Sequence, residues 1–199
     1  TSVIENNAII GNFAQFSGGG ININGSLRYF SFNLISGNTS LDGAGISENA
    51  TGNQFRTFNN NIVVNNTSTN NTVYVKPLCT LIKNTIIDNT ASSSIISVNA
   101  YHNANIINNN TITRNILTGS SPTSTVNVTS YAPTTINFKK NNIYGNTSNY
   151  EVYTGILQST PSLNFENCWW NTTVSNNIDS KIYDFLDNNL LTIVDYSPF

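Results

Sequence analysis

Hydrophobic and polar positions along this chain follow one nine-residue phrase that occurs seven times. An apolar residue opens the phrase, asparagine stands at its fourth position, an apolar residue at its sixth and asparagine at its ninth. Successive copies begin 26, 28, 23, 26, 31 and 27 residues apart. A recurring period of this length is typical of a solenoid, in which each repeat forms one turn of a stack.

Each position of the phrase defines a column of equivalent residues. The opening column contains Ile4, Phe30, Phe58, Leu81, Ile107, Phe138 and Phe165. The first asparagine column contains Asn7, Asn33, Asn61, Asn84, Asn110 and Asn141, and Cys168 takes this place in the seventh copy. The apolar column that follows contains Ile9, Ile35, Val63, Ile86, Ile112, Ile143 and Trp170. The closing column contains Asn12, Asn38, Asn66, Asn89, Asn115 and Asn146, with Thr173 in the last copy.

The two apolar columns are five residues apart, and this odd spacing predicts a bend within the phrase. Both columns should face the core, but successive side chains of a straight strand alternate between its faces. A bend at or beside the first asparagine resolves the conflict, because asparagine tolerates the left-handed backbone conformation. We therefore predict an all-β fold, a single-stranded parallel β-helix of six to seven coils. Its core stack comprises Phe30, Phe58, Leu81, Ile107, Phe138 and Phe165.

Stacking of equivalent positions predicts contacts between successive coils. The first asparagine column should form a hydrogen-bonded ladder, because each amide carries two donors and an acceptor. Cys168 should end this ladder as a small buried residue. Asp88 and Arg114 occupy the same position in successive coils, about 4.8 Å apart, and should form an ion pair.

The phrase resembles the repeats of right-handed parallel β-helix proteins of the pectate-lyase-like superfamily. It is closest to the Phe-x-x-Asn and Gly-Gly-x-Ile motifs of chlamydial polymorphic membrane proteins and similar adhesin-like repeats. The first motif is matched at 30–33, 58–61 and 138–141, and the second at 18–21 and, with alanine for one glycine, at 43–46. The segment 167–171, Asn-Cys-Trp-Trp-Asn, resembles the closing segment of microbial surface β-helix proteins. The resemblance implies right-handed winding, and it indicates a fold, not an activity.

The two ends of the solenoid are expected to differ. Residues 1–174 should form the coils, and 175–199 a capping segment of the same domain. There, Ile178, Ile182, Phe185 and Leu186 fit one face of a short helix beginning after Ser175 and Asn177. Only Thr1–Val3 precede the first phrase, so the N-terminal coil should be open. Removed upstream repeats or another chain would cover it, which makes end-to-end assembly a further expectation.

The amino-acid composition limits the expected cellular location of the protein and the classes of partner that it could bind. Charged residues make up 9% of the chain and the net charge is -2, so nucleic acid is not an expected partner. The 38 asparagines and 46 serines and threonines favour a secreted or cell-surface protein. The sequence has no apolar run of membrane-spanning length and no leader or methionine, which suggests a processed protein or a fragment. Cys79 and Cys168 lie about three coils apart, too far for a disulfide.

Residues that could carry chemistry are sparse. The resemblance makes a polysaccharide lyase or hydrolase an alternative function, but the acids before Glu166 are isolated in the sequence, and a glycosidase needs a close pair of carboxyls. His102 is the single histidine and is expected to be a solvated surface residue. Asp184, Asp187 and Asp195 could offer oxygen ligands to Ca²⁺, but capping and solvation explain them more simply. We expect neither a metal nor a cofactor.

Three surface features remain as candidates for binding. Tyr144, Tyr150 and Tyr153 cluster in the sixth coil and could stack on the sugars of a glycan. A weak basic stripe is formed by Lys83, Lys139, Lys140 and Arg114. A threonine column comprises Thr39, Thr67, Thr90 and Thr147. It raises ice binding as a lesser alternative, although its Asn-Thr-Ser context indicates a corner of the coil.

The sequence as a whole favours a non-enzymatic structural or adhesin-like protein. Expected partners are further copies of the chain, neighbouring repeats of a longer chain, or a cell-surface glycan or protein. The segments Thr118–Tyr131 and Thr147–Thr154 are the expected contact loops.

Overall fold

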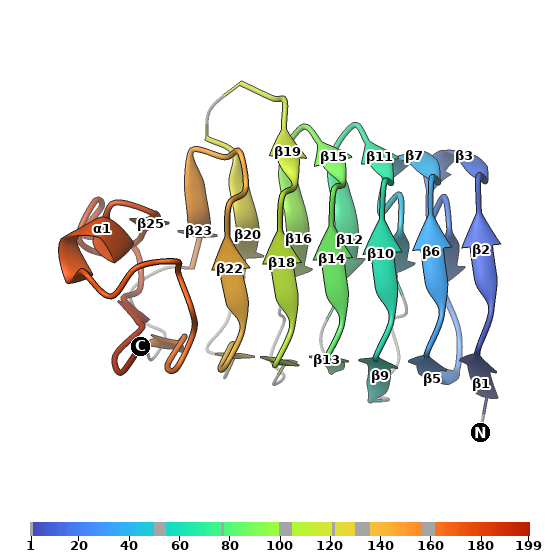
Figure 1. Cartoon of the computed structure of the whole chain (residues 1–199), viewed down its shortest axis with the longest axis horizontal. Helices are drawn as coiled ribbons and strands as arrows, with labels where there is room; N and C mark the ends of the chain where they lie inside the picture. The colour runs from blue at the N-terminus through green and yellow to red at the C-terminus, as the bar shows by residue number, and fades with distance from the viewer. Residues whose placement is uncertain are drawn as a thin grey trace.

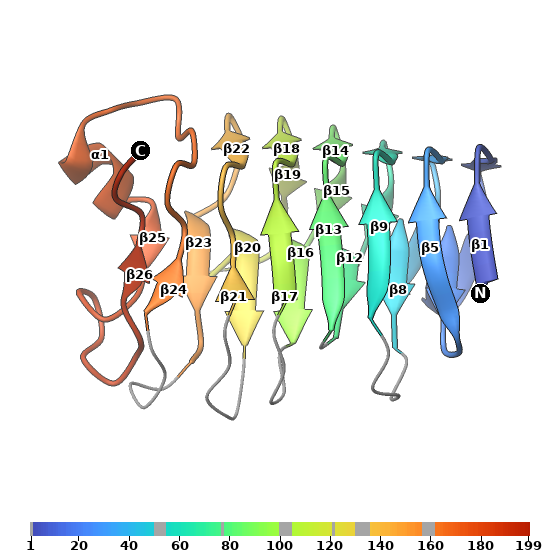
Figure 2. The same ribbon diagram turned by 90° about the horizontal axis from the view of Figure 1, so that it is seen from below.

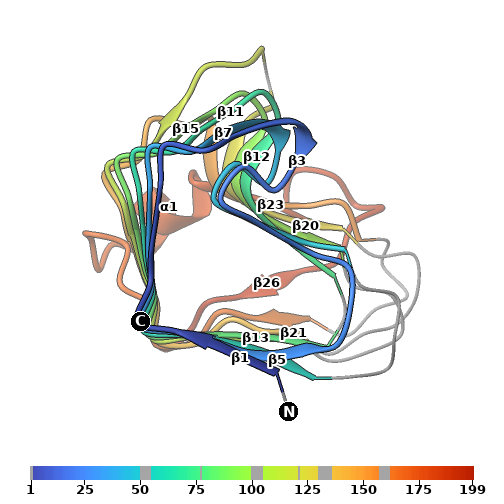
Figure 3. The ribbon, with the colours of Figure 1, turned by 90° about the vertical axis from the view of Figure 1, so that its right-hand side faces the viewer.

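The structure is a computed structural model that describes residues 2–49, 55–76, 78–99, 105–120, 122–129, 136–156 and 162–199. Within these residues the chain forms a parallel β-solenoid of about six turns. The first coil lies at one end of the stack and the C-terminal segment at the other (Figure 1). Seen from the N-terminal end, the chain runs clockwise as it recedes, so the winding is right-handed (Figure 3). The predicted fold class is confirmed.

The described strands form four parallel sheets, which we call A to D, and the phrase supplies the first two. Sheet A contains β1 (Ser2–Glu5), β5 (Leu27–Ser31), β9 (Arg56–Asn59), β13 (Cys79–Ile82), β17 (Asn105–Asn108), β21 (Ile136–Asn137), β24 (Leu163–Asn164) and β26 (Val194–Asp195). Sheet B contains β2 (Ala8–Ile10), β6 (Leu34–Ser36), β10 (Ile62–Val64), β14 (Thr85–Ile87), β18 (Thr111–Thr113) and β22 (Asn142–Tyr144).

Sheets C and D are formed by the segments between one phrase and the next, apart from the last strand of sheet D, which follows the seventh phrase. Sheet C contains β3 (Phe13–Ser17), β7 (Thr39–Asp42), β11 (Thr67–Ser68), β15 (Thr90–Ala91) and β19 (Ile116–Leu117). Sheet D contains β4 (Ile21–Ile23), β8 (Ile46–Glu48), β12 (Asn71–Val75), β16 (Ser94–Asn99), β20 (Ser124–Thr129), β23 (Tyr150–Thr154) and β25 (Ile182–Tyr183). The two phrase sheets and these two sheets surround a single core (Figure 3).

Backbone bends lie immediately before both asparagine columns. The residue before each member of the first column has a positive φ: Asn6, Phe32, Asn60, Lys83, Asn109, Lys140 and Asn167. The same holds before the closing column, at Gly11, Gly37, Asn65, Asp88, Arg114 and Gly145. The predicted bend is therefore beside the asparagine. Non-glycine residues adopt this conformation at a cost, and here a bonded asparagine follows each of them or, after Asn167, Cys168.

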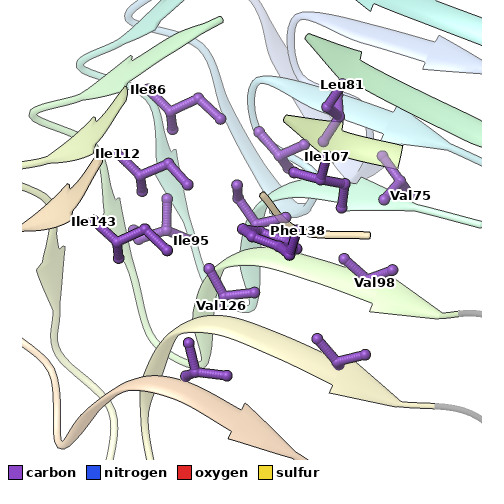
Figure 4. Close-up of a cluster of buried hydrophobic side chains, with 14 of the residues drawn as sticks. Val75, Leu81, Ile86, Ile95, Val98, Ile107, Ile112, Val126, Phe138 and Ile143 are labelled. Carbon is purple, nitrogen blue, oxygen red and sulfur yellow. The ribbon is translucent and has the colours of Figure 1, made fainter. Parts of the chain in front are cut away.

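The apolar columns of the phrase fill the core. Members of the core stack are at most 1% exposed, as are Ile35, Ile86 and Ile112 of the facing column. Phe30 and Phe58 have ring centroids 5.8 Å apart, and Phe138 and Phe165 stack at 4.6 Å. Figure 4 shows Leu81 and Ile107 from sheet A and Phe138, which directly follows β21, together with Ile86, Ile112 and Ile143 from sheet B and valines from sheet D. Tight side-chain packing of this kind contributes much of a protein's stability.

The glycine motif has a packing role at the start of sheet D. A β-carbon on Gly20 would lie 2.5 Å from the carbonyl oxygen of Gly45 and 2.7 Å from Cγ2 of Ile35. One on Gly45 would lie 2.7 Å from Cγ1 of Val63. Glycine at these positions lets the backbone leading into β4 and β8 approach sheet B, so only a residue without a side chain fits.

The C-terminal segment differs from the prediction. Helix α1 spans only Ser175–Asp179, and its N-cap is Val174, so Ser175 lies inside the helix. Ile182 belongs instead to β25, where it pairs with Val152. Phe185 and Leu186 lie beyond the helix, and Leu186 is 69% exposed. After the helix the chain returns to strand structure. β25 extends sheet D and β26 extends sheet A, both at the end of the stack (Figure 2).

Candidate functional site

The first asparagine column forms a continuous ladder through the structure. At each junction the backbone N–H and Nδ2 of one asparagine donate to Oδ1 of the asparagine one coil further along. Between Asn61 and Asn84 both distances are 3.0 Å, and Nδ2 of Asn61 also donates to the carbonyl oxygen of Phe30 at 2.9 Å. The ladder joins Asn7, Asn33, Asn61, Asn84, Asn110 and Asn141. It satisfies buried backbone groups that water cannot reach.

A second ladder, which the sequence analysis did not specify, runs along the closing column. It joins Asn12, Asn38, Asn66, Asn89, Asn115 and Asn146 with the same geometry. Asn38 donates to Oδ1 of Asn66 at 3.0 Å from its backbone and at 2.9 Å from Nδ2. The signal was present, because asparagine recurs at the ninth position as regularly as at the fourth. The two ladders hold the two corners on either side of sheet B.

Cys168 ends the first ladder, as expected. The backbone N–H and Nδ2 of Asn141 lie 3.5 and 4.0 Å from its sulfur, and its thiol donates to the carbonyl oxygen of Phe138 at 2.9 Å. Both cysteines are free and buried. Burial raises the pKa of the Cys168 thiol to about 11. Burial, and then the carboxylate of Glu48, raise the pKa of Cys79 well above its usual value. Neither thiol is set up as a nucleophile.

Two of the four residues of the expected basic stripe, Arg114 and Lys139, form ion pairs. Arg114 donates to both carboxylate oxygens of Asp88, at 2.9 and 2.6 Å, which confirms the predicted ion pair. Lys139 Nζ lies 2.6 Å from Oε2 of Glu166, one coil further along. The two ion pairs neutralise half of the positive charge of the stripe, and no ion pair involves Lys83 or Lys140 among the described residues.

The sequence analysis did not predict a buried ion pair between the last residue of β8 in sheet D and the first residue of β9 in sheet A. Arg56 Nε lies 3.3 Å from Oε1 of Glu48, and their side chains are 3% and 0% exposed. The backbone N–H of Lys76 donates to Oε2 of Glu48 at 2.9 Å. Both residues stand two positions from a core residue, Glu48 after Ile46 and Arg56 before Phe58, so strand alternation was the available signal. Because both side chains are buried, we interpret this ion pair as a structural contact and not as a site for a substrate.

The aspartates of the C-terminal segment accept hydrogen bonds from backbone N–H groups. Asp184 is buried, and its two oxygens accept from the N–H groups of Leu186 and Val194 at 2.9 and 2.7 Å. The oxygens of Asp187 and Asp195 accept from the N–H groups of Asp184 and Ser197. A cavity of about 470 Å³ lies beside Asp179, Asp184 and Asp187. Among the residues with described positions, no group of three His, Cys, Asp or Glu side chains could hold a metal ion.

Tyr196 lines the same cavity and bonds to helix α1. Its hydroxyl donates to Oδ1 of Asp179 at 2.6 Å. Burial, followed by the bond to Asp179, raises the pKa of Tyr196 to about 12. The bond ties the last strand to the capping helix, so the cavity walls belong to the cap.

The three expected glycan-contact tyrosines do not form one cluster. Tyr144 lies on β22 in sheet B, whereas Tyr150 and Tyr153 lie on β23 in sheet D. Tyr183, which the sequence analysis missed, stacks on Tyr153 at 5.1 Å and lies 5.2 Å from Tyr150. These residues continue a column on the outward-facing positions of sheet D, formed by Tyr74, Ser97, Asn127, Tyr153 and Tyr183. One hydroxyl group, on Ser97, and one amide, on Asn127, therefore lie between Tyr74 and the Tyr153–Tyr183 pair along this face.

The expected contact loops are mostly strand. The segment 118–131 contains β20, and 147–154 contains β23; Ser121, Ser130 and Tyr131 lie outside the described residues, as does His102. Thr39, Thr67 and Thr90 begin strands of sheet C and pair in register, so this column does not mark a corner. Ile116 and Phe13 occupy the same column. The threonine array is therefore a single, interrupted row.

Except for Glu5, each described carboxylate has a hydrogen-bond or ion-pair partner in the structure. Glu151 is buried in β23, and its Oε2 accepts from Nδ2 of Asn146 at 3.0 Å. Burial raises its pKa, and the bonds from Thr125 and Asn146 oppose that rise. A buried carboxyl with a raised pKa can mark an active site. Here the carboxylate of Glu151 accepts a hydrogen bond from Asn146, the last asparagine of the second ladder, which is a structural role.

No model of a known protein family matches this chain, and no curated protein or solved structure matches it either. Within the described part of the chain, no helix has the length and apolar character needed to cross a lipid bilayer. The fold and the contacts above therefore carry the functional argument.

Proposed function

We propose that this protein is a non-enzymatic structural or adhesin-like component of a cell surface or extracellular assembly, with its N-terminal coil as an interface. The observation that carries the proposal is the distribution of exposed large hydrophobic side chains. Among described residues, six lie within 2–32, at Val3, Ile10, Phe13, Phe16, Tyr29 and Phe32. Only four lie in the much longer stretch 33–168, and six more lie in the C-terminal stretch 169–199, so exposed apolar side chains gather at the two ends of the stack. Concentrated apolar exposure marks interaction surfaces.

The rest of the molecule suits a rigid spacer. Two asparagine ladders link the first six coils, and ring contacts in the core stack join Phe30 to Phe58 and Phe138 to Phe165, so the rod should resist bending. Three ion pairs are present among the described residues, and two of them, Asp88–Arg114 and Lys139–Glu166, join successive coils. The low charge and high asparagine, serine and threonine content agree with a secreted or surface location. The likeness of the phrase to pectate-lyase-like and adhesin-like repeats supports the same proposal.

The test is whether the N-terminal coil drives association. We expect the protein to form oligomers or filaments whose mass, measured by light scattering and electron microscopy, rises with concentration. The double variant Phe13→Ser/Phe16→Ser should remain folded and lose this association, because both rings are exposed, at 77% and 68%. Leu186→Ser/Leu190→Ser is the matched control at the other end, where both leucines are also exposed. A protein that stays monomeric at every concentration, or associates equally in both variants, contradicts the proposed interface.

A second candidate function, glycan binding, is favoured by the outer face of sheet D. Oδ1 of Asn99 and of Asn127 is buried without a hydrogen-bond partner. They lie on the strands between Tyr74 and the Tyr153–Tyr183 pair. Sugar hydroxyls could supply the missing donors while tyrosine rings pack against the apolar faces of the sugars.

This second candidate is tested by binding to immobilised neutral polysaccharides. Tyr153→Ala/Tyr183→Ala should lower binding at least tenfold if sheet D holds the glycan. Tyr29→Ala is the control, because Tyr29 is 49% exposed but lies on sheet A. Equal binding by the two variants would exclude sheet D as the site.

A further inference from the structure

The outer face of sheet B is a flat and uncharged surface. Figure 1 shows its six strands side by side at the front of the stack, with no described segment across them. The two ladders that border this face are five positions apart in all six copies that contain both, so no insertion protrudes from it. Its outward positions form two columns in register, the first with Ala8, Leu34, Ile62, Thr85, Thr111 and Asn142 and the second with Ile10, Ser36, Val64, Ile87, Thr113 and Tyr144.

Apolar side chains are exposed on this face in the interior of the stack. Ile62 is 47% exposed, although its strand β10 pairs with β6 on one side and with β14 on the other. Phe32 lies at the corner two residues before β6 and is 55% exposed. Leu34, Val64 and Ile87 on the same face are partly exposed. Contiguous apolar exposure of this kind marks an interaction surface.

Charged residues lie at the two corners that flank the face. Lys83 precedes the first ladder and Asp88 precedes the second, so the two stand at opposite corners of the same coil. Lys83 is exposed and forms no ion pair among the described residues. The positive-φ residues of the first corner include Lys83 and Lys140 but no acid, whereas Asp88 belongs to the second corner. The nearest acid in the flanking corners is therefore across the face from Lys83.

A second copy can cover this face with its own sheet B in two ways. When the two stacks run parallel, a half-turn about an axis along the stack brings each corner against the opposite corner of the other copy. Lys83 then faces Asp88 of the second copy, and Ile62 lies over Val64. When the stacks run antiparallel, each corner meets its own equivalent, and Lys83 meets no acid. Charge complementarity selects the parallel arrangement.

We infer that two copies of this protein bind side by side, with their stacks parallel, through the outer faces of sheet B. The interface is isologous, so it closes at two copies and does not by itself build a filament. The inference goes beyond the proposed function, because the ends of the stack take no part in this contact.

The size of the face sets the strength of the pairing. Between the two ladders it measures about 16 Å along the strands and about 29 Å along the stack, from the usual rise and spacing of strands. Its flat projection is therefore about 460 Å², whereas a standard interface buries about 800 Å² on each partner. The face suits a weak and reversible dimer, which should form above roughly 10 μM.

The test is sedimentation equilibrium over a range of concentrations. It is run on the parent and on Phe13→Ser/Phe16→Ser, in which end-to-end growth is removed. In that variant the mass should rise from 21.7 kDa to twice this value and stop there. Adding Ile62→Glu should abolish the dimer, because it places a charge in the centre of the apolar contact. Ile106→Glu is the matched control, since Ile106 is a partly exposed, outward isoleucine on β17 of sheet A.

Two lysine variants test the parallel arrangement and leave the apolar contact intact. Lys83→Glu should weaken pairing roughly fivefold at low salt, because it places a carboxylate against Asp88 of the second copy. The effect should shrink at high salt. Lys140→Glu is the control at the same corner, because the position across the face in its coil is the uncharged Gly145. It should leave pairing unchanged.

The possible outcomes separate this inference from the proposed function. A Phe13→Ser/Phe16→Ser variant that stays monomeric at every concentration, or pairs as well with Ile62→Glu as without it, refutes pairing through sheet B. Equal losses in Lys83→Glu and Lys140→Glu refute the parallel arrangement. If the parent forms filaments while the phenylalanine variant is monomeric, only the side-by-side inference fails. If the parent itself stops at a dimer that Ile62→Glu abolishes, the inference holds and the end-to-end interface fails.

Discussion

Arg114 forms a bidentate ion pair with Asp88 of the preceding coil, in which Nε and Nη2 donate to different carboxylate oxygens at 2.9 and 2.6 Å. Both residues have a positive φ of 55° at equivalent bends. Hydrogen bonding to Arg114 is the main reason that the pKa of Asp88 is lowered from its ordinary value of 3.8. The pair therefore bridges two corners of the solenoid on its exposed surface.

Reversing one charge of this pair should have a small effect that depends on salt and pH. Arg114→Glu should lower the thermal midpoint by about 1–3 °C at low salt, because exposed ion pairs contribute little and are screened. Because the folded pKa of Asp88 is lowered, the contribution is present above the ordinary pKa and is lost as the pH falls through the lowered value. The swap Asp88→Arg/Arg114→Asp should restore the midpoint; no recovery would show that the pairing is not responsible.

Replacing a buried ladder residue should be far more damaging. Asn84→Leu removes the acceptor for two donors of Asn61 and the Nδ2 group that donates to Asn110 and to the carbonyl oxygen of Phe58, all buried. The backbone donor survives, but the remaining loss should lower the free energy of unfolding by about 3–5 kcal/mol and the thermal midpoint by roughly 8–15 °C. Asn142→Leu is the control, because Asn142 is exposed and bonds Thr111 at 3.3 Å. An unchanged midpoint for Asn84→Leu would refute the stabilising role of the ladder.

Extending the first ladder should stabilise the protein. Cys168→Asn places an oxygen where Asn141 now meets a sulfur at 3.5 and 4.0 Å, and sulfur is a weak acceptor. The new amide can also donate to the carbonyl oxygen of Phe138, as the thiol does now. We expect a gain of about 1 kcal/mol, measured by denaturant unfolding. Cys168→Ala should instead be destabilising, and a loss in both variants would show that the site cannot hold an amide.

Glu151 should make stability depend on pH in the acidic range. Burial raises the pKa of this carboxyl in the folded protein. Its protonation therefore favours folding: the contribution is complete below the unfolded pKa of about 4.3 and is lost as the pH rises through the raised folded value. Glu151→Gln should unfold at a higher denaturant concentration than the parent at pH 7 and lose that advantage near pH 4. A constant difference at both pH values would assign the effect to packing instead of titration.

The strands of sheets A and B could be predicted because the phrase repeats strictly. Its asparagines stay five residues apart in all six copies that contain both, and each pair encloses one inward apolar residue. Sheets C and D were not defined from sequence. The segments that contain them vary in length, and short elements such as Thr67–Ser68 become strands only because Thr39 and Thr90 pair on either side.

Contacts between side chains could be predicted where the two residues occupy the same position of the phrase in successive coils. Asp88 and Arg114 met that condition, and so did the ladder. Tyr183 did not, because it joins Tyr150 and Tyr153 through β25, which lies after the last phrase. The helix prediction failed at Ile182 for the same reason: pairing with Val152 outweighed the local helical pattern.

The constant spacing of the two ladders divides the coil into a part of fixed length and a part of free length. The two asparagines are five positions apart in all six copies that contain both, whereas the closing asparagine and the next opening position are 15 to 23 positions apart. Sequence can therefore be added on one side of the rod without disturbing the other. The solenoid is in effect a display scaffold, on which grafted peptides would stand in a row with a pitch of about 4.8 Å.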